Sequence, residues 1–157
     1  MLNKLRVRAQ GESGFTLVEL LVVMLILGLL AAIAIPSFFN QRDKARDADA
    51  KAHARTAQTA IETFATDHGG SYTGADADAL KAVESTLNDS TGLVVNSAGE
   101  KDYSITVGSE VDGQTFTIIR DTDGILDSEC TAHNEGGCPS DGNWAADGPA
   151  PAPTGTG

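Results

Sequence analysis

One carboxylate, that of Glu19, lies near the start of a long apolar run in the N-terminal part of the sequence. Residues 20–35, which follow it, carry no charged side chain. An ionised carboxylate deep inside a membrane helix costs roughly 2.5–3.5 kcal/mol on insertion scales, and such a group is by default a functional residue that needs a partner. Glu19 is therefore a candidate site residue whose positively charged partner has to be found.

Four acidic side chains form a second candidate region near the C-terminus: Asp121, Asp123, Asp127 and Glu129. Calcium takes several oxygen ligands, so these residues are a candidate calcium site. Their spacing lacks the third acid and the closing glutamate of an EF-hand loop. Asp-Gly at residues 123–124 is also a strong hairpin signal. We favour the hairpin, without a metal or any other cofactor, and keep calcium as the alternative.

The two cysteines, Cys130 and Cys138, could form a disulfide or bind zinc. A structural zinc site needs about four ligands, and only His133 lies nearby in the sequence. Residues 1–14 carry three basic side chains and one acidic one. A basic segment before an apolar run stays in the cytoplasm, and the residues after the run are exported. Cysteines in an oxidising exported compartment pair, so we predict a disulfide.

The charge distribution and the motifs that the sequence lacks exclude other functions. The formal net charge is −11, and because residues 1–14 carry +2, the remainder carries −13. Phosphate is repelled by such a surface, so nucleic acid is not an expected partner. The sequence contains no Gly-x-Ser-x-Gly elbow, phosphate-binding loop, His-Glu-x-x-His motif or Cys-x-x-Cys-His haem motif. We therefore predict no enzyme activity.

A single long helix, from about residue 15 to about residue 68, is predicted to position Glu19. Its first half is apolar on all sides and approaches the ~20 residues that span a bilayer. Beyond Pro36 the sequence becomes amphipathic, with an apolar stripe at helical spacing. The stripe consists of Ala50, Ala54, Ala57, Ile61 and Phe64. Gly69 and Gly70 offer the left-handed cap that ends helices.

A small head is predicted after this helix. Thr73 and Asp76 fit a capping box for a short second helix, whose apolar face would carry Leu80, Val83 and Leu87. Three or four antiparallel strands follow, including residues 103–107, 114–120 and 125–130. Trp144 is expected to pack on the head. The fold class is therefore α+β: a long helix packed on a small antiparallel sheet.

The segment "KLRVRAQGESGFTLVELLVVMLILGLLAAIAIPSF" resembles the N-terminus of a type IV pilin or of a type II secretion pseudopilin. The resemblance implies a leader that a prepilin peptidase cleaves after Gly14, and a new N-terminus at Phe15 that the same enzyme methylates. It also implies that the Phe15 amine pairs with Glu19 of a neighbouring subunit in a filament. Gly28 and Pro36 bracket a segment that is often unwound in related assembled filaments, which makes them candidates for unwinding here.

The resemblance also implies a domain organisation and a location. Residues 1–14 would be the cytoplasmic leader, residues 15–36 the membrane and filament-core half of the helix, and residues 37–68 its amphipathic half. The head would cover residues 69–144 with a disulfide loop at 130–138. The Pro-, Gly-, Ala- and Thr-rich composition of residues 145–157 predicts a disordered tail after it. The expected partners are copies of the chain itself, the prepilin peptidase, the assembly machinery and, before assembly, the membrane. The mature subunit would end in an extracellular surface filament.

Two alternatives to a pilus subunit remain open. A major pseudopilin of a type II secretion system has the same kind of N-terminus, and the cysteine loop favours the pilus over it. The other alternative is a secreted binding module, because Ala32-Ile33-Ala34 fits a signal-peptidase site with cleavage after Ala34. The N-terminal residue of the mature chain distinguishes them, since it is Phe15 in a pilin-like protein and Ile35 in a secreted module.

Basic and acidic side chains interleave along residues 42–55. One interpretation is a solvated helix face with i,i+4 pairs such as Asp47–Lys51. The other is contact with the acidic heads of neighbouring subunits, because residues 56–157 hold three basic and 17 acidic side chains.

Overall fold

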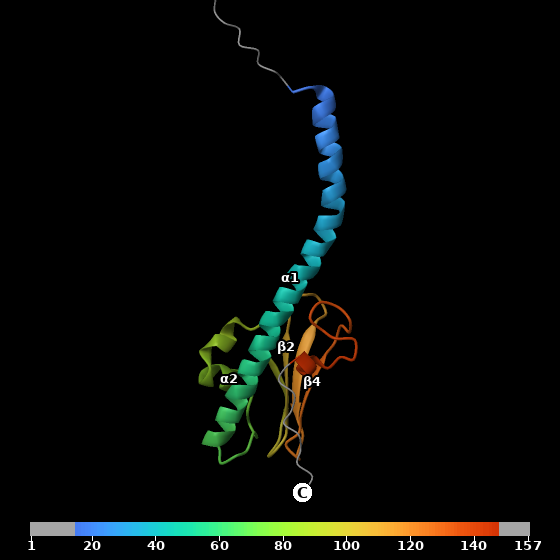
Figure 1. Cartoon of the computed structure of the whole chain (residues 1–157). Coiled ribbons are helices and arrows are strands. Elements are labelled where there is room, and N and C mark those ends of the chain that lie inside the picture. The colour runs from blue at the N-terminus through green and yellow to red at the C-terminus, as the bar shows by residue number, and fades with distance from the viewer. Residues whose placement is uncertain (1–14, 148–157) are drawn as a thin grey trace, which may run out of the picture. The chain divides into compact units, whose positions relative to one another are not determined.

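The computed structural model describes residues 15–147 and has the expected α+β architecture (Figure 1). Its helices are α1 (Leu17–Asp67) and α2 (Ala77–Val83), with short 3-10 helices η1 (Ser85–Asp89) and η2 (Trp144–Asp147). Its strands are β1 (Val94–Ala98), β2 (Tyr103–Gly108), β3 (Thr115–Arg120) and β4 (Leu126–Cys130). The described residues divide into two units, 15–38 and 39–147, which we call the apolar unit and the head.

The head contains one antiparallel sheet with the strand order β1-β2-β3-β4. Each strand pairs with its sequence neighbour, so the predicted meander is confirmed with four strands. Alternate residues of β2, namely Tyr103, Ile105 and Val107, are buried, while those between them are half-buried. This period-2 pattern is expected where one sheet face packs on a core and the other meets water.

The C-terminal part of α1 packs on the buried face of this sheet, as the ribbon of the head shows (Figure 1). The predicted stripe is confirmed at Ala50, Ala54, Ala57 and Ile61, which are buried, while Phe64 is partly buried. Alanine side chains allow the helix backbone to approach the sheet closely. The larger core side chains therefore come mainly from the sheet and the segments around it, as Tyr103, Phe116 and Trp144 illustrate.

The predicted end of α1 is confirmed, but the start of α2 differs from the expectation. Gly69 and Gly70 both have positive φ, and the N–H of Gly70 donates to the carbonyl of Ala65 at 2.7 Å. The N-cap of α2 is Asp76, whose carboxylate accepts from the N–H of Ala79 at 2.8 Å. The predicted capping box that began at Thr73 is therefore wrong. The helix begins after Asp76, and the Asp76 carboxylate already accepts from an N–H of the first turn.

The apolar face predicted for this region is confirmed in part. Leu80 and Leu87 are fully buried, although Leu87 lies in η1 rather than in α2. Val83 is 40% exposed, because α2 ends there and the chain turns into η1.

The hairpin between β3 and β4 has the predicted Asp-Gly turn. The N–H of Asp121 donates to the carbonyl of Ile125 at 3.0 Å, and Gly124 adopts φ +86°. A side chain at that φ would be strained, which explains the glycine. The pairing of β3 with β4 continues from Arg120↔Leu126 to Phe116↔Cys130.

The apolar unit is the N-terminal part of α1. This is the helix, among residues 15–147, that is long and apolar enough to cross a membrane, with mean hydropathy 2.9 over an 18-residue window. The α-helix is unbroken through Gly28 and Pro36. The predicted leader, Gly14 included, lies outside the described residues. The first residues of the predicted tail belong to η2, and residues 148–157 also lie outside the described part.

Candidate functional site

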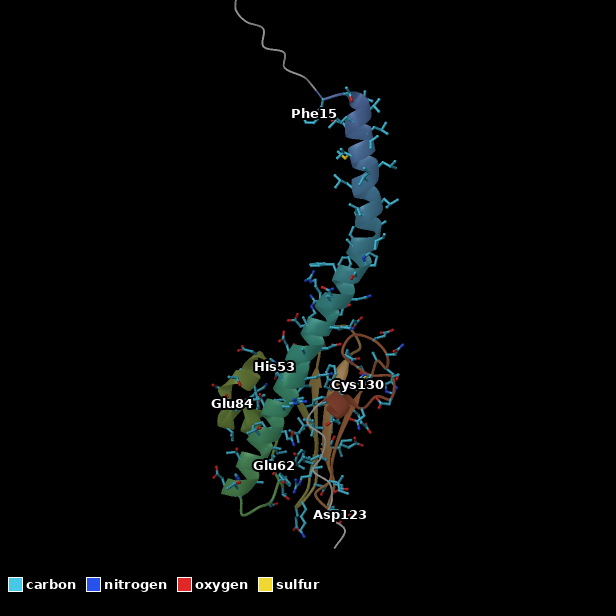
Figure 2. All side chains as sticks on the ribbon, in the orientation of Figure 1. Phe15, His53, Glu62, Glu84, Asp123 and Cys130 are labelled. Carbon is cyan, nitrogen blue, oxygen red and sulfur yellow. A yellow bond between two sulfur atoms is a disulfide. The ribbon has the colours of Figure 1, made fainter. Side chains whose placement is uncertain are left out.

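The first candidate site is the start of α1, where Phe15 and Glu19 lie (Figure 2 labels Phe15). Thr16 directly precedes the helix, and its Oγ1 accepts from the N–H of Glu19 at 3.2 Å. Phe15 is 78% exposed, and Glu19 lies in the first turn with an exposed side chain. Among residues 15–147 no cation pairs with the Glu19 carboxylate. The Glu19 carboxylate is therefore open to solvent in the described part of the chain.

Thr16 is a residue that the sequence analysis missed. Its hydroxyl satisfies one of the N–H groups that have no helical partner in the first turn. The signal was Thr16-x-x-Glu19, the pattern of a capping box. The cap fixes the helix start two residues after Phe15, so the backbone between Phe15 and Glu19 is ordered by the chain's own hydrogen bonds.

A second polar site lies inside the head and is centred on Asp47, which is fully buried. Its Oδ1 accepts from the Ser109 hydroxyl at 2.7 Å, and its Oδ2 accepts from the N–H of Gly137 at 2.6 Å. Asp47 therefore ties α1 to the end of β2 and to the disulfide loop. A Cβ on Gly137 would lie 2.9 Å from the Asp47 Cβ, so glycine permits this close approach.

The predicted Asp47–Lys51 surface pair is wrong, because Asp47 is buried and bonds to the head instead. The signal for this role was in the sequence. Asp47 precedes Ala50 by three residues and so continues the spacing of the apolar stripe. A polar residue on a buried stripe indicates an internal hydrogen-bond acceptor, because a buried charge needs bonded partners.

Three basic residues of α1 contact other side chains of the head. The Lys51 ammonium lies 5.5 Å from the Phe116 ring centre, and the Arg55 guanidinium lies 5.6 Å from that of Trp144. Arg46 pairs with Glu110 at 3.4 Å. Arg55 is exposed and the Arg46–Glu110 pair lies at the surface, so the solvated-face interpretation holds for these two cations. Lys51 is half-buried over the Phe116 ring.

Trp144 packs on the head as predicted. It is 1% exposed, and its indole N–H donates to the Glu129 carbonyl at 2.9 Å. Its ring meets Phe116 edge to face, with 5.8 Å between ring centres. Trp144 thus fixes η2 against β4 and closes the core.

Glu62 joins four segments at the other end of the head (Figure 2). Its carboxylate accepts from the hydroxyls of Tyr72 at 2.8 Å and Tyr103 at 3.0 Å, and it pairs with Arg120 at 3.5 Å. Burial, followed by the charge of Glu62, raises the pKa of Tyr103 well above its ordinary value. Burial and the hydrogen bond to Glu62 raise the pKa of Tyr72. No periodicity in the sequence pointed to this contact, because its partners are distant along the chain.

The predicted disulfide joins Cys130 to Cys138. The carbonyl of Gly142 accepts from the N–H of Cys130 at 2.9 Å, so the loop is also held to the segment that follows it.

The four calcium candidates do not converge. One oxygen of Asp121 accepts from the N–H groups of Asp123 and Ile125, and Asp127 accepts from the N–H of Ser128. Within residues 15–147 no three His, Cys, Asp or Glu side chains are grouped to hold a metal ion. The hairpin thus accounts for Asp121, and calcium binding stays an untested prediction.

The chain thus combines a long helix, whose start is apolar and capped and carries a carboxylate, with a four-stranded antiparallel sheet in the head. The family described as the prokaryotic N-terminal methylation motif matches residues 10–35. A fimbrial protein of Pseudomonas aeruginosa is 30% identical over 135 residues, which are 78% of this chain and 88% of that protein. The chain belongs to the family of type IV pilins and related pseudopilins.

Two further relatives match mainly one part of the chain. The type IV major pilin of Myxococcus xanthus is 42% identical over 53 residues, 34% of this chain and 24% of that protein. The type II secretion system core protein G of Pseudomonas aeruginosa is 37% identical over 57 residues, 36% of this chain and 40% of that protein. The chain thus spans less than half the length of these two relatives. No solved structure matches it.

Proposed function

We propose that this chain is a structural subunit that polymerises, after removal of its leader behind Gly14, into a type IV pilus or a related surface filament. The observation that carries the proposal is the start of α1, where an exposed Glu19 carboxylate lies four residues after Phe15 and makes no ion pair among residues 15–147. The similarity to a fimbrial protein over 88% of its length supports the same function for the whole chain.

The proposed assembly step is an ion pair between two copies. Cleavage after Gly14 creates a positively charged amine on Phe15, which the prepilin peptidase then methylates. A charge in an apolar environment is costly when it is alone, and pairing with Glu19 of a neighbouring copy offsets the cost for both groups. The apolar unit exchanges lipid contacts for contacts with other copies at this step.

The same proposal gives the chain two locations. Before assembly it is a single-pass membrane protein with its leader in the cytoplasm and its head outside, because the basic leader precedes the apolar run. After assembly it is part of an extracellular filament. The proposed role is structural, without catalysis, and its partners are other copies and the membrane-bound assembly machinery.

Substitution of Glu19 by Val tests the ion pair. We expect Glu19→Val to insert in the membrane and to be cut to Phe15, but to yield few filaments in electron micrographs. Glu100→Val, which removes an exposed carboxylate in the β1–β2 turn, is the matched control and should assemble normally. A normal filament yield from Glu19→Val would contradict the pairing.

A pseudopilin of a type II secretion system is the second candidate, favoured by the similarity to core protein G. Deletion of the gene separates the two. Loss of surface filaments with normal protein secretion supports the pilus subunit, whereas loss of secretion supports the pseudopilin. Sequencing of the mature N-terminus addresses the secreted module, which requires Ile35 rather than a methylated Phe15.

A further inference from the structure

Two hydrogen bonds hold the backbone at the start of α1, and both of them end on Thr16. The Thr16 Oγ1 accepts from the N–H of Glu19 at 3.2 Å, and the Thr16 carbonyl accepts from the N–H of Leu20 at 3.2 Å. Phe15 and Thr16 lie outside the helix, which begins at Leu17. Thr16 is therefore the N-cap of α1. Both bonds lie within residues 16–20, so they do not involve the leader.

The Glu19 side chain takes no part in this cap. The cap uses the N–H of Glu19, whereas the carboxylate makes no hydrogen bond or ion pair within residues 15–147. The Glu19 side chain is exposed. The cap thus orders the backbone of Glu19 and leaves its charge open to solvent.

In the proposed filament, each chain carries both members of the ion pair, so a chain could also pair with itself. The Phe15 amine would lie four residues from Glu19 of the same chain, which competes with a neighbouring copy at a high effective concentration. Four residues of extended chain span up to about 14 Å, so an unordered chain end would permit this contact. A helix that began before Phe15 would also permit it, because opposite charges four helical residues apart are neighbours.

The capped start of α1 differs from both of these conformations. An N-cap residue has a non-helical backbone, so Phe15 does not lie one helical turn before Glu19. The two bonds to Thr16 also order the segment between Thr16 and Leu20. An ordered segment samples fewer conformations in which its two ends meet.

We propose that Thr16 is a positioning residue, whose cap keeps the Phe15 amine away from Glu19 of the same chain and so directs both charges to neighbouring copies. Thr16 acts through the backbone of Glu19 and does not itself bind either charge. A pair within one chain neutralises both groups without joining two copies, so its suppression favours the filament. The inference rests on the proposed filament function and explains how that site selects its partner.

Assembly of Thr16 variants in cells tests the cap. Thr16→Val keeps the shape of the side chain but has no acceptor, and we expect its filament yield in electron micrographs to fall on the order of fivefold. Thr16→Ser and Thr16→Asn keep an N-cap acceptor and should restore most of the yield. Thr63→Val is the matched control, because it removes an exposed hydroxyl that donates to the Thr59 carbonyl on the same helix, and it should assemble normally.

The order of these variants separates capping from side-chain packing. Valine resembles threonine most closely in shape, whereas asparagine differs most. A packing role for Thr16 predicts high yield from Thr16→Val and low yield from Thr16→Asn. That order, or equal yields from Thr16→Val and Thr16→Ser, would overturn the proposal.

Carbodiimide treatment measures the suppressed contact directly. The reagent joins a carboxylate and an amine in contact as an amide, with loss of one water, and a singly methylated amine still reacts. In processed chains dissolved in detergent, we expect several-fold less amide between Phe15 and Glu19 of one chain in the wild type than in Thr16→Val. Mass spectrometry of the N-terminal peptide detects the lost water.

The wild-type protein keeps this test decisive even if Thr16→Val is not processed. An amide between Phe15 and Glu19 within most wild-type chains would overturn the proposal without any variant. Equal amide yields in the wild type and in Thr16→Val would overturn it as well.

The wild-type filaments separate this inference from the proposed function. If the wild-type protein forms no filaments, the proposed function and the role of Thr16 both fail. If wild-type filaments form and are lost in Glu19→Val, but Thr16→Val assembles like the wild type, the role of Thr16 alone fails.

Discussion

Asp47 shows how one polar residue on an apolar helix stripe can organise a head. It is fully buried, yet both of its oxygens accept hydrogen bonds, from the Ser109 hydroxyl and from the N–H of Gly137. These bonds join segments that lie 62 and 90 residues away along the chain. Asp47 thus fixes where the disulfide loop lies on the helix, which the disulfide itself does not do.

Removal of this carboxylate is expected to destabilise the head. Asp47→Ala leaves the buried Ser109 hydroxyl and the part-buried Gly137 N–H without this acceptor, and we expect a loss of about 3 kcal/mol in the free energy of unfolding. Urea unfolding of the full chain in detergent, followed by fluorescence of Trp144, the single tryptophan, measures it. Asp49→Ala, at an exposed position on the same helix, should change stability by less than about 0.5 kcal/mol. Equal losses for the two variants would contradict the role of Asp47.

The tyrosines that contact Glu62 predict an alkaline limit to stability. Burial raises the pKa of Tyr103 and of Tyr72 in the folded head. In the unfolded chain both hydroxyls have a pKa of about 10. Because the folded state holds these protons more tightly, their contribution is fully present below pH about 10 and decreases as the pH rises further.

The free energy of unfolding should therefore fall as the pH rises above about 10, and the slope should be smaller in Tyr103→Phe. The same variant should lose about 1 kcal/mol at neutral pH, because it lacks the hydrogen bond to Glu62. Urea unfolding followed by Trp144 fluorescence, at neutral pH and above pH about 10, measures both changes in the free energy of unfolding. An unchanged alkaline slope in Tyr103→Phe would show that Tyr103 does not contribute.

At the scale of elements, α1 meets two different requirements along one helix. Its N-terminal part is apolar on every side, whereas its C-terminal part buries a narrow stripe of small residues against the sheet. The helix continues through Pro36, although proline removes one backbone hydrogen bond and clashes with the preceding turn. The residues around Pro36 are therefore the place where α1 is held least strongly by its own backbone.

Pro36→Ala is expected to strengthen the helix by about 3 kcal/mol locally. If the segment between Gly28 and Pro36 unwinds in the filament, the variant should assemble less well than the wild type, while membrane insertion is unchanged. Hydrogen exchange of filaments should show faster exchange at residues 29–35 than in the detergent-solubilised monomer. Equal protection in both states would contradict unwinding.

At the scale of the whole molecule, the family of the chain explains why an exposed apolar helix and an acidic head occur together. In the proposed function, the helix first contacts lipid and then other helices, whereas the head stays in water throughout. A chain with net charge −11 needs local contacts between opposite charges when its heads come together.

Gly14→Ala tests whether the chain enters this assembly route as a precursor. We expect the variant to retain residues 1–14, because the proposed peptidase requires glycine before the cleaved bond. Because the leader is retained, no free amine forms on Phe15, and the variant should form no filaments. Mass spectrometry of the N-terminus measures the processing, and a variant trimmed to Phe15 at the normal rate would contradict the proposed leader.

The sequence alone determined the long helix, its stop at Gly69-Gly70, the Asp-Gly hairpin and the α+β class. These features depend on local periodicity and on residues with special backbone preferences. It also pointed to Glu19, because a charge in an apolar run is visible without a fold.

Only the tertiary structure decided what the polar residues of the head contact. Asp47 changed from a surface partner of Lys51 to a buried acceptor, and Lys51 became a half-buried cation over the Phe116 ring. Glu62 likewise gained partners 10, 41 and 58 residues away. Such contacts depend on which distant segments the sheet and the disulfide loop bring onto the helix, and local spacing carries no information about that.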